Sequence, residues 1–483
     1  MHQPLVLTPR PQAVPAGNDP RRPTQADTGA DWRAQLRRHP DKRLIIDQLI
    51  AAIDRLLTAQ VNAILHHPRM QRLEATWRGL LQLVETAASA RAVKIRMLDV
   101  AWRELARDFE RAIEFDQSQL FAKVYSEEFG TPGGEPFGLL IGDYYVRHNR
   151  SADHPTDDVG TLKSIAAVAA AAFCPFVTSC SPALLGLDSF SDMGGTVDLS
   201  RSFDGPDHLR WRGLRDADDA RFLGLALPRI LMRQPYGHDP HRVDGFRFTE
   251  YAGRPGAADY LWGNAAFAFA TVVMRAYHHY GWFADIRGAP EDMEAGGVLT
   301  EFPGYAFPSF GRSGPAAPPL EVYFSDGQEK QLSEMGMVPL SRVGYLDACV
   351  FYSTQSLHNP KAYDRATATS NARLSAMLQY VLCASRFAHY IKLIGRDKIG
   401  SFATAAEFED HLRSWLRGYC LGNDDAALSF KARYPLREAE VQVRDIAGRP
   451  GAFGCVIHLK PHFQLDDIQT SFRLVTELVG PQG

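Results

Sequence analysis

The sequence lacks the features of secreted, membrane-spanning and nucleic-acid-binding proteins. Its 483 residues include six cysteines and no CxxC pair, which argues against a disulfide framework or a structural zinc site. The N-terminus has no signal-peptide pattern, and the most apolar run, IAAVAAAAFCPFV, is too short to cross a bilayer. The net charge of −3 provides no overall positive field for nucleic acid. We therefore expect a cytoplasmic protein with no membrane or nucleic-acid partner.

Motifs for common enzyme chemistry are missing as well. The sequence contains no P-loop GxxxxGK[ST], no dinucleotide-binding GxGxxG and no nucleophile elbow GxSxG. His238 and His241, like the adjacent His278 and His279, lack the HExxH spacing of a helical zinc site. No residue is therefore assigned to catalysis, to a metal or to a cofactor, and we expect none of the three.

One glycine-rich stretch, EEFGTPGGEPFG at 127–138, raises the question of a phosphate site. No lysine or serine follows its glycines, and its glutamates would repel a phosphate. We predict a stiff corner instead, in which glycines supply turns with positive φ and prolines restrict the backbone. The alternative hypothesis is an α/β enzyme that uses Glu127, Glu128 or Glu135 as its acid or base. The predicted corner residues are Gly130, Gly133, Gly134, Glu135 and Pro136.

Alternating helix and strand patterns predict an α/β fold with a mixed sheet. The patterns used below are helices at 42–65, 70–86, 99–113 and 370–395, and strands at 92–98, 137–146 and 468–478. Residues 439–461 predict a strand, a Gly/Pro turn and a second strand. The chain divides into a Pro-rich tail expected to be disordered, an N-terminal helical region, a core domain with a long irregular segment, and a C-terminal domain. Their predicted limits are 1–40, 41–90, 91–368 with the irregular part at 288–320, and 369–483.

Two apolar patterns favour an assembly protein over an enzyme. Apolar residues recur every three or four positions between 46 and 64, nearly as in a coiled-coil seam, although Gln60 interrupts the row. The final strand pattern has only one strongly apolar face, which suits a strand that adds to another sheet. The candidate interface residues are Ile46, Ile50, Ile53, Leu57 and Ile64 in the helix, and Ile468, Thr470, Phe472, Leu474 and Thr476 in the strand.

Nine sequence blocks, taken in order, resemble one known family. They include LEATWRGL, FDQSQLFAKVYSEEFGTPGGEPFGLLIGDYYV, YLWGNAAFAFA, NARLSAMLQYVLCASRFAHYIK and KARYPLREAEVQV, and they run from about residue 42 to the end. The chain is similar through these blocks to the large subunit of the type VI secretion contractile sheath, the TssC/VipB/EvpB family. The resemblance implies a structural protein of contractile-tail-sheath fold that needs no cofactor.

The resemblance also implies partners. It predicts pairing with a small sheath subunit of the TssB/VipA type and polymerisation with other copies around an Hcp-like inner tube. It further implies assembly on a baseplate and recycling by the ClpV ATPase, in the bacterial cytoplasm. The helix at 42–65 would pack with the small subunit and carry the ClpV contact, and the strand at 468–478 would insert into a neighbour's sheet. Because residues 1–40 and 288–320 depart from the family pattern, a second hypothesis is a divergent paralogue that caps or regulates the sheath.

Overall fold

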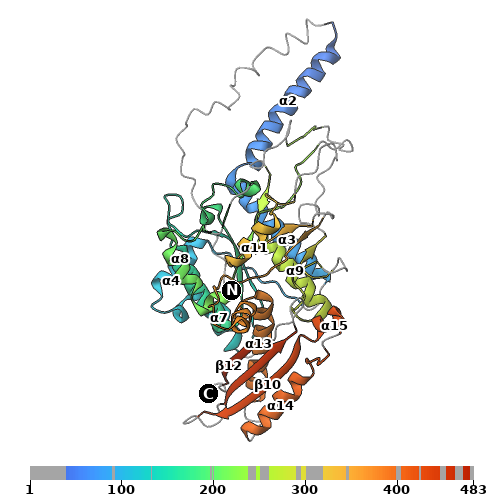
Figure 1. Ribbon diagram of the computed structural model, residues 1–483. Helices are drawn as coiled ribbons and strands as arrows, with labels where there is room; N and C mark the ends of the chain where they lie inside the picture. The colour runs from blue at the N-terminus through green and yellow to red at the C-terminus, as the bar shows by residue number, and fades with distance from the viewer. Residues whose placement is uncertain are drawn as a thin grey trace, which may run out of the picture.

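Parallel strands form the central layer of the fold. In the computed structural model (Figure 1), they pair in the order β1-β2-β3-β7, and each neighbouring pair is parallel. The strands are β1 (Leu140–Val146), β2 (Phe176–Cys180), β3 (Leu223–Leu227) and β7 (Val338–Pro339). The structure describes residues 40–89, 93–131, 133–195, 198–199, 201–237, 246–250, 260–289, 295–300, 319–343, 348–398, 404–423, 426–446, 453–462 and 472–478.

Helices cover both faces of this sheet. Successive strand residues point to opposite faces, so Val177 packs in one apolar core with α9, while Phe176 packs in another with α7. A parallel sheet buried on both faces is the expected arrangement for strands this apolar. The helices around the sheet are α7 (Asp158–Ala172), α8 (Leu209–Arg215), α9 (Ala265–Tyr280) and α11 (Asp326–Glu334).

Two N-terminal helices precede the sheet, and both predicted helices are confirmed. The first, α2 (Lys42–Leu65), begins where the Asp41 carboxylate accepts the N–H of Arg43 at 3.0 Å. The second, α3 (Pro68–Ser89), begins at a proline, which is favoured in a first helical turn. Figure 1 shows α2 projecting from one end of the molecule.

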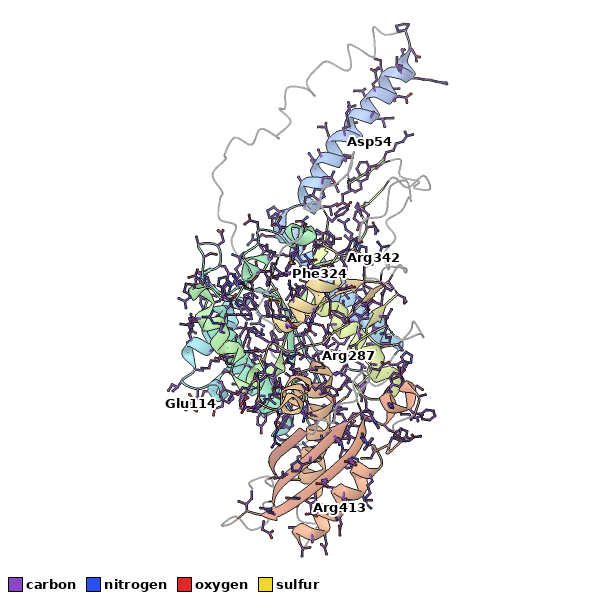
Figure 2. All side chains as sticks on the ribbon, viewed as in Figure 1. Asp54, Glu114, Arg287, Phe324, Arg342 and Arg413 are labelled. Carbon is purple, nitrogen blue, oxygen red and sulfur yellow. The ribbon has the colours of Figure 1, made fainter. Side chains whose placement is uncertain are left out.

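The C-terminal part forms a separate antiparallel sheet at the opposite end from α2 (Figure 1). Its apolar residues pack against α13 and α14 around Trp282 and Phe387. Figure 2 labels one residue near each end of the molecule, Asp54 on α2 and Arg413 on α14. The elements are α13 (Leu378–Lys398), α14 (Ala405–Arg417), β10 (Leu436–Asp445), β11 (Phe453–Pro461) and β12 (Phe472–Leu478).

The remaining elements are short. Among the described residues they are α4 (Trp102–Arg111), α5 (Gln119–Phe121), a π-helix (Ala122–Ser126), α6 (Glu127–Phe129), β4 (Ile230–Leu231), β5 (Trp262–Gly263), β6 (Val298–Leu299), β8 (Ser341–Arg342), β9 (Cys349–Val350), α12 (Ala366–Ser375) and α15 (Leu428–Arg433), besides several 3-10 turns.

The α/β class is confirmed, while several local predictions are wrong. Parallel and antiparallel pairs lie in separate sheets. The predicted strand at 92–98 has no regular structure over its described part, where the backbone pairs with no strand. Its basic side chains instead bind Glu128 of α6 and Glu135. Ala101, not Asp99, precedes α4. The helix predicted at 370–395 is broken between α12 and α13.

Candidate assembly surfaces

The apolar row of α2 faces solvent. A rotation of about 100° per residue places Ile46, Ile50, Ile53, Leu57 and Ile64 within about 60° of one another around the helix. Their exposed fractions run from 41% at Leu57 to 61% at Ile64. Fully burying an exposed aliphatic side chain contributes about 1.5–3 kcal/mol, so covering the exposed half of one contributes roughly half as much. An exposed apolar row is typical of a protein-binding face. The structure thus brings the five helical candidates onto one surface, which we name the α2 stripe.

A second exposed apolar row lies on α3 and was not identified as a surface from the sequence. Leu73, Trp77, Leu81 and Val84 recur at helical spacing, and Trp77 is 55% exposed. We name this row the α3 stripe. The sequence shows these residues as the apolar set of the helix, but apolarity alone suggests the side that faces the core. The two stripes lie on consecutive helices of the chain, α2 and α3.

The core-facing side of α3 is made of other residues. Ala75 and Leu83 are buried in the same cluster as Phe267 of α9. A Cβ atom at Gly79 would lie 2.5 Å from the Phe267 ring, so only glycine permits this close approach. One sequence signal could have identified the buried side of α3. Small residues stand four apart at Ala75 and Gly79, and Leu83 follows four residues later.

The glutamates of the 127–138 stretch pair with basic side chains. Glu128 is buried, and its carboxylate binds Arg96 and accepts the backbone N–H of Glu135 at 2.8 Å. Glu135 accepts hydrogen bonds from Lys94 Nζ at 2.5 and 2.7 Å, and Lys94 holds the pKa of Glu135 below its usual value. Glu127 is exposed at the start of α6. Ion-paired carboxylates are stabilised in the charged form, which suits a structural role better than proton donation.

The glycines of this stretch shape a tight corner. Gly130 ends α6, and Gly133 has a φ of 83°, a conformation that favours glycine. At Gly134 a Cβ atom would lie 2.2 Å from the Glu128 carbonyl oxygen. Pro136 follows, half-buried, before the chain enters β1. The geometry supports the interpretation of residues 127–138 as a corner between a helix and a strand.

The C-terminal candidates are only partly described. Phe472, Leu474 and Thr476 belong to β12, where Leu474 pairs with Ile457 of β11 in the same chain. Ile468 and Thr470 lie outside the described residues. Because β12 follows β11 in the order β10-β11-β12, it forms an edge of the sheet as the described residues define it. An edge position is what strand exchange between chains would require.

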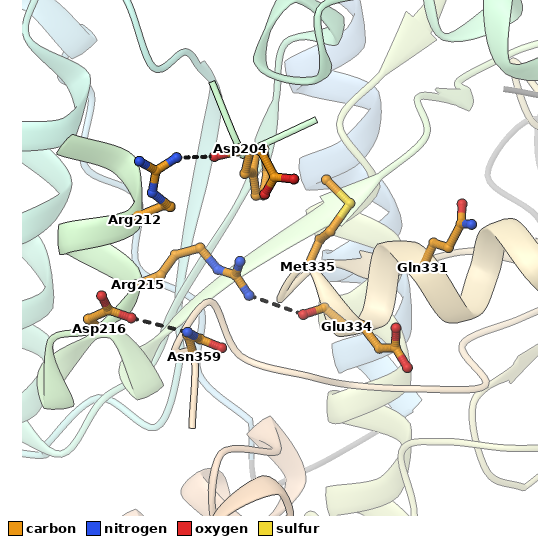
Figure 3. Close-up of a pocket in the computed structure, with 9 residues that line it drawn as sticks. Asp204, Arg212, Arg215, Asp216, Gln331, Glu334, Met335 and Asn359 are labelled. Atoms are coloured by element: carbon orange, nitrogen blue, oxygen red, sulfur yellow. Dashed lines mark hydrogen bonds between the residues drawn. The ribbon is translucent and has the colours of Figure 1, made fainter. Parts of the chain in front are cut away.

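A cavity of about 280 Å³ lies between α8 and α11 (Figure 3). Arg212 Nη1 donates to the Phe203 carbonyl at 2.5 Å, and Arg215 Nη2 donates to the Glu334 carbonyl at 3.1 Å. Burial lowers the pKa of Arg215 to about 10. Three carboxylates line the same cavity: Asp204, Asp216 and Glu334. Because charges of both signs are mixed there, the cavity does not favour an anion and offers no set of groups for catalysis.

The histidine pair that the structure describes is not arranged as a metal site. His278 and His279 are exposed neighbours in the last turn of α9, with ring centroids 5.2 Å apart. His238 and His241 lie outside the described residues. Across the described ranges, no group of three His, Cys, Asp or Glu side chains is arranged to hold a metal ion. None of the helices in those ranges combines the length and the hydropathy of a membrane span.

Comparison with known proteins decides the family. Residues 47–358 match the family model VipB, described as "EvpB/VC_A0108, tail sheath N-terminal domain". The chain belongs to this tail-sheath family. Residues 367–478 match the model VipB_2, described as "EvpB/VC_A0108, tail sheath gpW/gp25-like domain".

A curated relative agrees with the two models. The chain is 38% identical to the type VI secretion system sheath protein TssC1 of Pseudomonas aeruginosa over 436 residues, which cover 90% of this chain and 86% of TssC1. The resemblance drawn from nine sequence blocks is therefore confirmed. The tail-sheath family gives this chain its function, that of a structural large subunit of the type VI secretion sheath.

Proposed function

We propose that this chain pairs through the α2 and α3 stripes with a small sheath subunit of the TssB/VipA type. Membership of the tail-sheath family supports pairing and self-assembly. The single observation that carries the site is the exposed α2 stripe, five aliphatic residues on one face of a helix that projects from the molecule. Apolar rows of this kind are stable in water mainly when another helix covers them.

The pairs then polymerise into a helical sheath around an Hcp-like inner tube in the bacterial cytoplasm. The sheath assembles on a baseplate, and contraction drives the inner tube outward. ClpV recognises α2 in contracted sheath and recycles it. The chain acts through its interfaces rather than as an enzyme, and ion-paired glutamates at 127–138 and the mixed charges of the cavity support this view.

The C-terminal domain links neighbouring subunits by exchanging its last strand, 468–478. Main-chain hydrogen bonds suit this role, since they join two chains without depending on particular side chains. The edge position of β12 supports the proposal. The family models meet between residues 358 and 367, which supports a domain boundary near 368.

Pairing is tested by a double substitution on the α2 stripe. Ile50→Glu with Ile53→Glu places two charges in the proposed interface, and we expect affinity for the co-expressed small subunit to fall at least about a hundredfold. Ala51→Glu is the matched control, because Ala51 is exposed on the other side of α2. Affinity is measured by co-purification and titration. Equal retention of partner by the double variant and the control would exclude the α2 stripe as the interface.

The same co-expression separates a sheath-building subunit from a capping or regulating paralogue. A building subunit forms long tubules with its partner. A paralogue binds the partner or the sheath ends without forming long tubules.

A further inference from the structure

The base of α2 is fixed to the core by two hydrogen bonds to one residue. Asn62 Nδ2 donates to the Glu250 carbonyl at 2.9 Å, and His66 Nε2 lies 3.0 Å from Glu250 Oε1. Asn62 lies in the last turn of α2, and His66 is its C-cap. Glu250 is 184 residues from His66 in sequence, so these contacts join the projecting helix to a distant segment of the core.

Glu250 is itself held rigidly. Its carboxylate accepts two hydrogen bonds from Arg233, at 2.6 and 3.1 Å, and one from the Tyr236 N–H at 2.8 Å. The Arg233 and Glu250 side chains are only 3% and 2% exposed. Burial disfavours both charges, but their pairing outweighs it, so the pKa of Glu250 is lowered and that of Arg233 is raised. Two opposite charges paired in a buried site provide a firm anchor point.

The anchor extends to α3. Arg233 Nε donates to Glu74 Oε1 at 2.7 Å, and Arg78 Nε donates to the same oxygen at 2.8 Å. The Arg78 guanidinium also donates to the Tyr236 hydroxyl at 2.9 Å. Arg233 therefore bridges a carboxylate that holds α2 and a carboxylate that belongs to α3. The positions of both stripe-bearing helices therefore depend on the same buried cation, Arg233.

The two α2 contacts lie on the side of the helix opposite the α2 stripe. Counting from Ile46 at about 100° per residue, Asn62 lies at about 160° and His66 at about 200°. The stripe is centred near 0° on the same count. Contacts four residues apart fix the rotation of a helix as well as its direction. Holding α2 by this side therefore turns the stripe away from the core.

A small tilt at the base of α2 becomes a large displacement at its tip. The helix has 24 residues, which gives a length of about 36 Å. A tilt of about 10° at the base would displace the tip by about 6 Å, more than the pitch of one helical turn. A partner that must cover the whole α2 stripe thus depends on the geometry near Asn62 and His66.

We propose that Asn62, His66, Glu250 and Arg233, which we name the α2 clamp, position the α2 stripe for the partner subunit. These four are positioning residues and do not themselves touch the partner. The clamp sets how much of the free protein presents α2 in the binding orientation, so weakening it lowers the apparent affinity without changing the interface. The inference rests on the proposed function, because it takes the α2 stripe as the partner surface.

The test uses Asn62→Ala with His66→Ala in the full chain. This double variant leaves the buried Arg233–Glu250 pair intact, and alanine favours helix, so α2 itself should persist. Single-molecule FRET between dyes at positions 55 and 107, attached without cysteine chemistry, reports the direction of α2 at picomolar concentration and without a partner. Titration with the purified small sheath subunit then gives the apparent Kd. The matched control is Asp47→Ala, an exposed α2 position outside the clamp.

We expect the double variant to broaden the FRET distribution and to raise the apparent Kd about tenfold. Circular dichroism should stay unchanged, and His66→Gln, which keeps a hydrogen-bonding side chain, should recover most of the affinity. An unchanged FRET distribution, or a broadened one with the control's Kd, would overturn the proposal. If the wild-type chain does not bind the small subunit, the proposed function fails instead, and the FRET comparison alone decides whether the clamp orients α2.

Discussion

At the scale of single residues, buried groups of this protein hold helices to the rest of the core. His389 of α13 is 1% exposed, and its Nε2 lies 2.9 Å from the Ala172 carbonyl at the end of α7. Burial lowers the pKa of His389 to about 4 from an ordinary 6.5. The folded protein therefore keeps this imidazole neutral at pH values where the unfolded chain would protonate it.

This shift predicts a pH-dependent loss of stability. Because the folded pKa is lower than the unfolded one, the unfolded chain binds more protons between pH 6.5 and 4, and stability falls as the pH falls through that window. Between pH 6.5 and 4, we expect the unfolding free energy of the wild-type protein to fall by about 3 kcal/mol more than that of His389→Gln. The glutamine keeps a hydrogen-bond donor for the Ala172 carbonyl but does not titrate. Denaturant unfolding at several pH values measures this, with exposed His279→Gln as the control. If the unfolding free energies of wild type and His389→Gln changed equally with pH, His389 would not be the source of the pH dependence.

At the scale of elements, the contact between α3 and α9 explains why the α3 stripe is exposed. Gly79 lets the two helices approach until the Phe267 ring fills the space of a side chain. We expect Gly79→Ala to lower the unfolding free energy by about 1–3 kcal/mol, because the methyl group overpacks this contact. Gly213→Ala is the matched control: it also lies in a helix, but no atom lies within 4 Å of the added Cβ. It should stabilise by about 0.5–1 kcal/mol. Equal effects of the two substitutions in denaturant unfolding would contradict this packing.

Local patterns predicted the elements well where periodicity alone defines them. The helix limits of α2 and the strand-turn-strand of β10 and β11 follow from spacing and turn residues. The small residues Ala75 and Gly79 are only a weak signal for the buried side of α3, because Phe267, which fills that contact, lies far along the chain. The alternation at 92–98 indicated a strand, although Lys94 and Arg96 alternate because their side chains bind Glu135 and Glu128. The α2 clamp was missed for the same reason, since His66 and Glu250 are 184 residues apart.

At the scale of the whole molecule, the two candidate assembly surfaces lie at opposite ends. The α2 stripe projects at one end, and β12 forms a sheet edge at the other (Figure 1). We therefore expect deletion of residues 466–483 to leave pairing with the small subunit largely intact and to abolish polymerisation. Size-exclusion chromatography measures the pairing, and electron microscopy measures the polymers. Tubules formed without this segment would exclude strand exchange as the link between protomers.

We expect this chain to build a sheath together with a small partner subunit. Negative-stain electron microscopy of the full chain co-expressed with that subunit shows whether the pair assembles. We expect long hollow tubules from the pair, and aggregated or poorly soluble protein from the chain alone, because its apolar stripes are left uncovered. A monodisperse monomer that ignores the small subunit and forms no tubules would contradict the account.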